Sequence, residues 1–379
     1  MWHFNNITKL SLYIHIPFCV KKCIYCDFYS VESRKDLTIA FLEILCQQIE
    51  KLEGNFFTIY IGGGTPTVLD LPLLEKLLNS LTKFSPLEFT IEANPESLNK
   101  DKIKLFLDKG INRLSIGVQS LRDDKLKKLG RLHSVKEAKE KIFLAKKCGF
   151  KNISIDLIFG VWEEDFKNWQ QELEEAIKLP ITHISCYSLT YEKDTPLYRE
   201  VKAKKIIPLK EKKVADMYKY TLDYLPKKGF LQYEVSSFSK RGFLCKHNLN
   251  YWRNNPYLGL GPSAASYIEG LRTQNVSSVE DYIKRVRENK EIIVRKERLS
   301  PKRRAKEYAC LKIRCKEGID FEEFKKKTGL DFWELEAPEL PFLLKHKLIK
   351  FKKRNKKIKG ISLTKKGFLF ADTASSSLL

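Results

Sequence analysis

The chain has 379 residues, of which 43% are hydrophobic and 31% are charged, a composition that is typical of globular proteins and excludes a largely disordered chain. The length is sufficient for one large domain and a smaller appended one. The formal net charge is +23, with more than half of the excess in residues 275–379, and no apolar run reaches the roughly 18 residues that a membrane span requires.

Residues 1–10 contain no basic stretch followed by an apolar one, so we expect no signal peptide. From residue 11 onward, short β-branched runs alternate with longer amphipathic ones. Six such pairs predict an α/β fold of parallel βα units, either a partial or full TIM-like barrel or, as the alternative, an open doubly wound sheet. The predicted strands are 11–16, 57–62, 88–93, 113–119, 152–159 and 183–189. The predicted helices are 37–52, 71–83, 100–109, 134–148, 165–179 and 210–228.

After Tyr267 the pattern becomes mostly helical and basic, which predicts two domains, 1–274 and 275–379. Predicted helices over 280–289, 302–314, 321–328 and 338–345, followed by a hairpin over 348–353 and 360–363, resemble a winged-helix module. Because no set of base-reading side chains is apparent, we expect no specific nucleic-acid partner. The basic charge is typical of a Lys-rich solvated surface, and it leaves peripheral membrane association and self-association open.

Three cysteines follow the first predicted strand in one short loop: Cys19, Cys23 and Cys26. Three thiolates can bind three irons of a [4Fe–4S] cluster and leave the fourth iron open for a chelating amino acid. The alternatives are buried cysteines or a zinc site, but zinc prefers four ligands in paired spacing and the other cysteines are scattered. The nine cysteines are irregularly spaced, which does not indicate a disulfide framework and fits a reducing cytoplasm. Lys21 and Lys22 are expected to bias the thiols toward thiolate.

Polar residues stand at the ends of the later strands, where the site of a parallel βα fold lies. The Gly-rich run 62–65 can present backbone amides to a ligand, and its alternative is a tight turn. A carboxylate can bind ribose hydroxyls, and a guanidinium can bind a ligand carboxylate; for Asp156 and Arg131 the alternative is a structural salt bridge. The strand-end candidates are Glu92, Gln119, Arg131 and Asp156.

The C-x3-C-x2-C spacing after the first strand resembles the radical S-adenosylmethionine (SAM) superfamily. Five motifs resemble its oxygen-independent coproporphyrinogen III oxidase, or HemN-like, branch across nearly the whole chain: Tyr13-Ile-His-Ile-Pro-Phe-Cys19, Gly63-Gly-Thr-Pro-Thr67, Gly117-Val-Gln119, Asp156-Leu-Ile-Phe-Gly160 and Gly259-Leu-Gly-Pro-Ser-Ala264. The resemblance implies a cluster on the three cysteines and a radical formed by cleavage of SAM. It implies SAM contacts at Tyr13, Tyr25, Gly63, Gly64, Thr65, Glu92, Gln119, Arg131 and Asp156.

Two departures argue against coproporphyrinogen decarboxylation. Phe28 replaces the fourth cysteine of the HemN-like enzymes, and few residues precede Cys19. The segment His247-Asn-Leu-Asn-Tyr251-Trp252 instead matches the HNxxYW signature of HemW, a family of haem chaperones. Histidine can ligate haem iron, and Tyr and Trp offer apolar faces to a porphyrin; the alternative is a packed aromatic loop with a hydrogen-bonded histidine.

The resemblance therefore implies a cytoplasmic haem chaperone with a [4Fe–4S] cluster and SAM. Such a protein binds haem or another tetrapyrrole, with His247 as the predicted haem contact, and passes haem to acceptor proteins such as respiratory enzymes. No catalytic residue is assigned. The alternative is an oxygen-independent coproporphyrinogen III oxidase, and a further one is another radical transformation of a tetrapyrrole.

Overall fold

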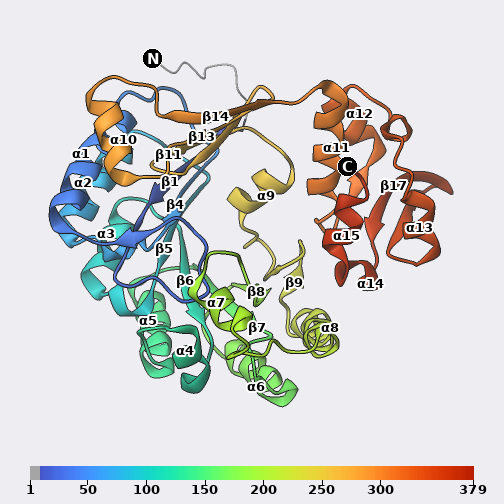
Figure 1. Ribbon diagram of the computed structural model, residues 1–379, viewed down its shortest axis with the longest axis horizontal. Coiled ribbons are helices and arrows are strands. Elements are labelled where there is room, and N and C mark those ends of the chain that lie inside the picture. The colour runs from blue at the N-terminus through green and yellow to red at the C-terminus, as the bar shows by residue number, and fades with distance from the viewer. Residues whose placement is uncertain (1–8) are drawn as a thin grey trace.

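The computed structural model describes residues 9–379 and is built around one twelve-stranded sheet (Figure 1). Most of residues 1–10, for which we expected no signal peptide, lie outside the described residues. Six parallel strands form the middle of the sheet and confirm the six predicted ones. They are β1 (Ser11–Ile16), β4 (Thr58–Gly63), β5 (Glu88–Ala93), β6 (Arg113–Gln119), β7 (Asn152–Phe159) and β8 (His183–Ser188).

Further strands extend the sheet on both sides. Beyond β1 lie β11 (Tyr257–Leu260), β12 (Ala265–Ile268), β13 (Leu271–Asn275) and β14 (Ile293–Arg298). Beyond β8 lie β10 (Ser237–Ser239) and β9 (Leu231–Gln232). Because β14 and β9 are free edges, the sheet is an open, partial barrel.

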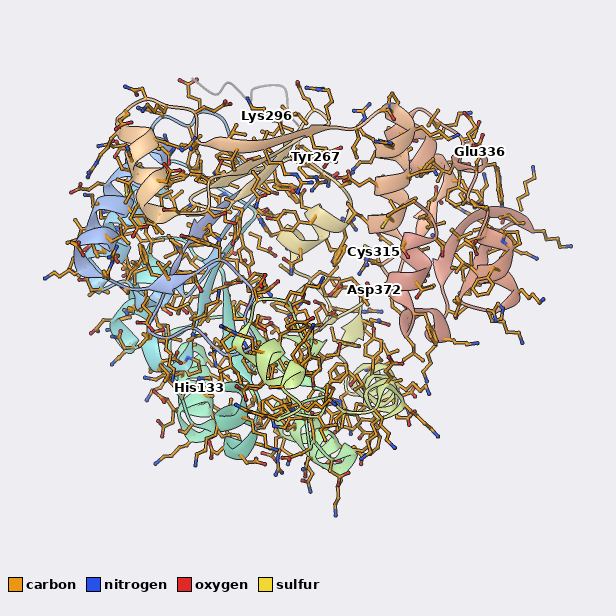
Figure 2. The ribbon with its side chains drawn as sticks, viewed as in Figure 1. His133, Tyr267, Lys296, Cys315, Glu336 and Asp372 are labelled. Atoms are coloured by element: carbon orange, nitrogen blue, oxygen red, sulfur yellow. The ribbon has the colours of Figure 1, made fainter. Side chains whose placement is uncertain are left out.

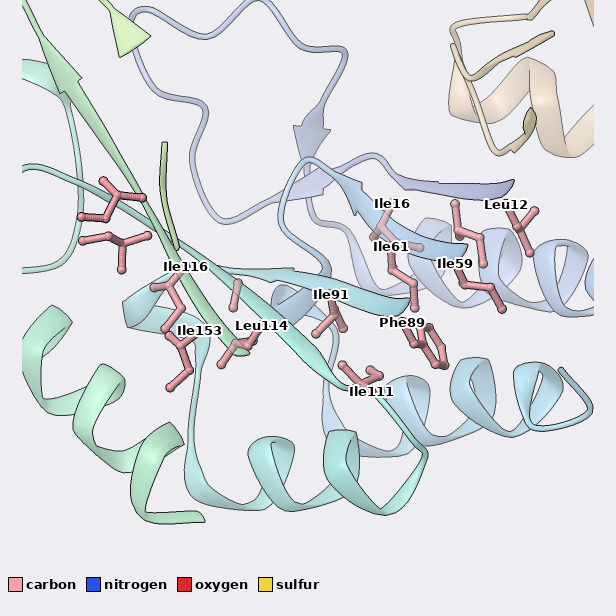
Figure 3. Close-up of a cluster of buried hydrophobic side chains, with 14 of the residues drawn as sticks. Leu12, Ile16, Ile59, Ile61, Phe89, Ile91, Ile111, Leu114, Ile116 and Ile153 are labelled. Carbon is pink, nitrogen blue, oxygen red and sulfur yellow. The ribbon is translucent and has the colours of Figure 1, made fainter. Parts of the chain in front are cut away.

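Alternate residues of the parallel strands point to opposite faces of the sheet. One set is apolar and packs under the helices, as Figure 3 shows for Ile59, Ile61, Phe89 and Ile91. The other set is polar and faces the concave side. The helices that follow the strands are α1 (Lys35–Glu50), α2 (Leu71–Leu81), α3 (Lys100–Asp108), α4 (Asp123–Leu129), α5 (Val135–Cys148), α6 (Phe166–Ala176), α7 (Pro196–Lys202) and α8 (Glu211–Lys227).

Several of these helices begin at side-chain caps. Asp70, Asn99 and Ser134 accept a hydrogen bond from the backbone N–H three residues ahead, at the starts of α2, α3 and α5. Helix α5 ends at Gly149, whose φ of 117° is in the range that favours glycine. The caps fix where each helix starts relative to the strand before it.

The C-terminal part confirms the predicted helices and hairpin. It comprises α11 (Pro301–Lys312), β15 (Ile319–Asp320), α12 (Phe321–Thr328), α13 (Leu340–Lys345), β16 (Ile349–Arg354), β17 (Lys357–Leu363), α14 (Lys365–Phe368) and α15 (Ala371–Ser376). Strand β17 lies between β15 and β16. The module contacts the large sheet where Lys316 N–H donates to Tyr233 O (2.9 Å), beside Cys315 (Figure 2).

The expectation of a mostly helical chain after Tyr267 is wrong for β13 and β14. Strand β14 is almost entirely exposed and charged, as is common in edge strands, so it carries no apolar alternation. Helix α10 (Val279–Arg287) connects these two strands in the sequence. The large sheet thus extends beyond residue 274, and the division into two domains at that point stays a prediction. No helix among residues 9–379 is long and apolar enough to cross a membrane.

Candidate functional site

A cavity of about 430 Å³ lies on the concave side of the sheet, at the carboxyl ends of the parallel strands. Its walls come from β4 to β8 and from the loop after β1. Tyr13 and His247 do not line it. The predicted residues that do are Cys19, Cys23, Cys26, Tyr25, Gly63, Gly64, Thr65, Glu92, Gln119, Arg131 and Asp156.

The cysteine loop is closed by a short parallel pair, β2 (Phe18–Cys19) and β3 (Val31–Glu32). It also docks on the glycine loop that follows β4. Gly64 N–H donates to Ile16 O (2.8 Å), and Thr65 N–H donates to Phe18 O (2.7 Å). The two loops therefore form one wall, which fixes the thiols relative to the Gly63 and Gly64 amides.

The thiols lie in a mixed environment. Cys19 Sγ is 3.6 Å from Thr65 Oγ1, and Arg131 Nη1 donates to Cys23 Sγ (3.4 Å). Burial raises the pKa of the Cys19 thiol, and it raises the pKa of Cys26 to about 11 although Lys22 acts in the opposite direction. Lys22 biases Cys26 toward thiolate as expected, but desolvation outweighs its charge, so the pKa of this thiol stays raised.

These thiols nevertheless fit an iron–sulfur cluster. A bound metal deprotonates ligating thiols outright, which compensates for burial. Among residues 9–379, no three His, Cys, Asp or Glu side chains converge to hold a single metal ion. The three cysteines are spread over one wall of the cavity, as ligands to several irons must be.

Arg131 is held beside the cluster cysteines by polar contacts. Its Nη2 donates to Asn94 Oδ1 and to Gly117 O, both at 2.8 Å. Its Nε is buried without a partner and is a spare donor for a ligand. Within the described residues Arg131 makes no ion pair with Asp156, so the salt-bridge alternative is not formed.

Two buried carboxyl groups face the cavity. Tyr60 O–H donates to Glu92 Oε1 (2.6 Å), and Gly63 N–H donates to Oε2 (3.3 Å). Burial raises the pKa of Glu92 to about 7 against these hydrogen bonds. Burial also raises the pKa of Asp156, and a hydrogen bond with the Ser185 hydroxyl opposes that shift. Both groups can accept hydrogen bonds from a ligand's hydroxyl or amino groups.

Gln119 ends β6 with a φ of 65°, the left-handed region that non-glycine residues rarely adopt. The register of β6 against β7 shifts between Ile116 and Gln119. His133 supports this end of the strand, with Nε2 3.1 Å from Val118 O and Nδ1 3.1 Å from Glu96 (Figure 2). Such local strain is typical of functional sites.

His247 lies behind the cavity wall, on α9 (Lys246–Trp252), and is 1% exposed. Its Nδ1 is 2.8 Å from Thr58 Oγ1, and its Nε2 is 2.9 Å from Tyr251 Oη. Because Thr58 donates its proton to Ser11, it accepts from Nδ1–H, and the Tyr251 hydroxyl donates to Nε2. Burial lowers the pKa of His247 to about 3. The imidazole is therefore neutral, and both nitrogens are engaged.

Several residues of the site escaped prediction from the sequence. Asn94 comes two residues after Glu92, and Ser115 comes four residues before Gln119 on the same strand, a spacing that places strand residues on one face. For the others the sequence gives no signal of this kind. Tyr13 was predicted but bonds instead to His15, with its hydroxyl 3.0 Å from Nδ1. The residues missed are Tyr60, Asn94, Arg113, Ser115, Ser185 and Asn248.

We expect Gly64→Ala to lower SAM affinity at least tenfold in equilibrium dialysis. A Cβ at Gly64 would lie 2.5 Å from Phe18 O, a backbone atom, so the cysteine loop must move. Overpacking of this kind costs about 1–3 kcal/mol. Gly229→Ala is the control, because nothing lies within 4 Å of its Cβ and it is far from the cavity. Unchanged SAM affinity in Gly64→Ala would contradict the close fit of the two loops.

Comparison with known proteins identifies the families to which parts of this chain are similar. A model of the radical SAM superfamily matches residues 13–176, and a model of the HemN C-terminal domain matches residues 299–370. The heme chaperones HemW of Lactococcus lactis and Bacillus subtilis are 37% and 36% identical to this chain. The matches cover 94% and 84% of the chain, and 94% and 87% of those proteins.

One solved structure shares the fold over almost the whole chain. It is coproporphyrinogen III oxidase (HemN) from Escherichia coli, a radical SAM enzyme. The TM-score is 0.83, and the match covers 98% of this chain and 90% of that chain. The sequence identity is 22%, so this likeness shows the fold alone.

Proposed function

Because this chain belongs to the HemW family of radical SAM proteins, we propose that it is a haem chaperone that binds haem and passes it to acceptor proteins such as respiratory enzymes. The observation that carries this proposal is the similarity to named haem chaperones over 94% of the chain. All nine cysteines are free, which fits a reducing compartment, and we place the protein in the cytoplasm.

The cavity supplies the groups that a cluster and SAM require. Cys19, Cys23 and Cys26 would hold the [4Fe–4S] cluster, and the chemistry supplied by the bound cluster is chelation and one-electron reduction of SAM. The spare Nε of Arg131 can bind a carboxylate. Glu92 and Asp156 can accept from amino and ribose groups.

The mouth of the cavity supports binding of a flat, anionic ligand. Phe28 stands where a fourth cysteine would be, lines the cavity and is 67% exposed. Val20, on the same loop, is 52% exposed, and Lys21 and Lys22 lie beside it. An apolar surface next to ammonium groups complements a porphyrin face and its propionates. Exposed apolar side chains grouped at a cavity mouth are typical of binding sites.

The role of His247 as haem contact stays a prediction with a direct test. Ligation of iron by Nε2 requires that the Tyr251 hydroxyl releases this nitrogen. Haem titration followed by visible spectra should compare wild type, His247→Ala and Thr58→Val. Thr58→Val removes the hydrogen bond to Nδ1 but keeps the imidazole. We expect His247→Ala to alter the haem spectrum and weaken binding about tenfold or more, and Thr58→Val to keep the wild-type spectrum.

Two outcomes would contradict that role. Equal spectra and affinity in wild type and His247→Ala would exclude His247 as a ligand. Equal losses in His247→Ala and Thr58→Val would show that the histidine only supports the fold of α9. Peripheral membrane association through the basic C-terminal module and self-association stay predictions that vesicle sedimentation and light scattering can test.

The second candidate is an oxygen-independent coproporphyrinogen III oxidase, favoured by a cavity that is lined by most of the residues predicted to contact SAM. An anaerobic assay with dithionite, SAM and coproporphyrinogen III distinguishes the two. We expect no protoporphyrinogen, because Phe28 replaces the fourth cysteine of those enzymes. Formation of protoporphyrinogen at many turnovers per chain would favour the enzyme over the chaperone.

A further inference from the structure

Arg113 is a buried cation without a partner in the cavity wall. It is the first residue of β6, is 2% exposed and lines the cavity. Its Nε and Nη1 have no hydrogen-bond partner, and within residues 9–379 its guanidinium forms no ion pair. Burying an unpaired guanidinium is costly, so its presence requires an explanation.

The neighbouring carboxylates do not neutralise Arg113 by contact. Glu88, Glu92 and Asp156 are close enough to interact with it through space. Each is engaged elsewhere: Glu88 accepts two backbone N–H groups at the start of α9, Glu92 accepts a tyrosine hydroxyl, and Asp156 bonds to a serine. The N–H groups of the Arg113 guanidinium are therefore left without an acceptor from these carboxylates.

A second polar group without a partner lies next to Arg113. Thr90 on β5 pairs in register with Arg113 and, on its other side, with Tyr60 on β4. Residues in register on adjacent parallel strands point to the same face of the sheet. The Thr90 hydroxyl is buried and has no hydrogen-bond partner. Arg113 and Thr90 thus present unsatisfied groups at one level of the concave face, whereas Tyr60 at the same level donates to Glu92.

Arg113 and Arg131 lie at different depths in the cavity. Arg131 reaches the carbonyl of Gly117, four residues along β6 from Arg113 and therefore about 13 Å away along the strand. The cavity holds two guanidinium groups at two depths, one beside the cluster cysteines and one at the floor. SAM carries a single carboxylate, so it cannot satisfy both groups with that carboxylate.

We propose that Arg113 forms a carboxylate-binding subsite at the floor of the cavity, separate from Arg131. Among the described residues no hydrogen bond engages any N–H group of the Arg113 guanidinium, and a guanidinium edge without a partner can bind a carboxylate in bidentate fashion. The amino-acid end of SAM is the group that chelates the open iron beside the cysteines, so the carboxylate that fits Arg113 is a propionate of a tetrapyrrole. This assignment rests on the proposed function.

The test measures equilibrium binding to reconstituted full-length protein with two matched pairs of probes. One pair is SAM and decarboxylated SAM, and the other is haem and haem dimethyl ester. For Arg113→Met we expect haem to bind about 10- to 100-fold more weakly, the effect of losing a charged hydrogen bond. Haem dimethyl ester and both SAM probes should change less than threefold. A loss confined to SAM would place the SAM carboxylate at Arg113 and overturn the proposal.

Controls separate the subsite from the fold. Arg122→Met removes an arginine that pairs with Asp124 outside the cavity and should change no affinity. If Arg113→Met does not fold, Arg113→Lys keeps the charge with a single donor group and should weaken the same probe by a smaller factor, about three- to tenfold. Equal changes in haem and its dimethyl ester, or no change in haem, would overturn the proposal. Absence of haem binding by wild type would instead overturn the proposed function, and with it the propionate assignment.

Discussion

Cys23→Ala is expected to abolish the iron–sulfur cluster. The three cysteines share one short loop, and no other described cysteine lines the cavity, so no other thiol can replace the lost ligand. After anaerobic reconstitution, iron and sulfide should fall from near cluster stoichiometry to near zero, and the visible absorbance of the cluster should disappear. SAM affinity should fall with it, because the open iron supplies the chelating contact.

The matched control for this prediction is Cys148→Ala. Cys148 is a partly exposed thiol at the end of α5, outside the cavity, and its removal should leave iron content unchanged. Retention of a full cluster by Cys23→Ala would show that another ligand completes the site. Loss of iron in both variants would show that the measurement reports stability and not ligation.

Lys125→Met is expected to destabilise the fold by about 3–5 kcal/mol at neutral pH. Lys125 Nζ lies 2.5 Å from Glu164 and 2.8 Å from Glu172, and all three side chains are buried. Glu172 also accepts hydrogen bonds from Ser120 and from Leu121 N–H, just after Gln119. Without the ammonium group, two buried carboxylates face each other, and the turn that follows β6 loses its anchor. Urea unfolding at fixed pH measures the loss.

The same variant should show a characteristic pH dependence. Burial already raises the pKa of Glu164 above its unfolded value, with Lys125 opposing the shift. Removing the cation raises the folded pKa further, so the unpaired charge destabilises the fold at high pH and is relieved by protonation as pH falls. The deficit relative to wild type should therefore be smaller at pH 5 than at pH 8.

Lys139→Met is the comparison, because Lys139 pairs with Glu175 on the surface, where such pairs contribute about 0–1 kcal/mol. Equal losses in the two variants would contradict a special role for the buried ion pairs. A deficit in Lys125→Met that grows as pH falls would contradict the assignment of two charged, buried glutamates.

The alternation of apolar and polar residues was enough to predict the six central strands. Each of these strands buries one face under helices, so its apolar residues recur with period two, as Ile59 and Ile61 show. Strand β14 lacks this signal because neither face is buried, and only its pairing with β13 makes it a strand. An exposed edge strand is stabilised by hydrogen bonds to the neighbouring strand, and its own sequence does not indicate that pairing.

The residues of the candidate site that belong to a sequence motif were predicted. Those that only the three-dimensional packing brings to the cavity were missed. The cysteine loop and the Gly63–Gly64 amides share one wall as expected. The charge of Lys22 acts on the pKa of Cys26 in the expected direction, but burial, which a sequence does not show, outweighs it. Arg113 escaped notice because a single arginine at a strand start carries no motif, and only the absence of a partner marks it.

We propose that this radical SAM protein binds and delivers haem and does not oxidise coproporphyrinogen III. The most direct measurement adds haem to the reconstituted wild-type protein with SAM, follows the visible spectrum, and assays a parallel sample with coproporphyrinogen III under the same reducing conditions. We expect saturable haem binding with a spectrum distinct from that of free haem, and we expect no formation of protoporphyrinogen. Protoporphyrinogen formation without saturable haem binding would contradict it.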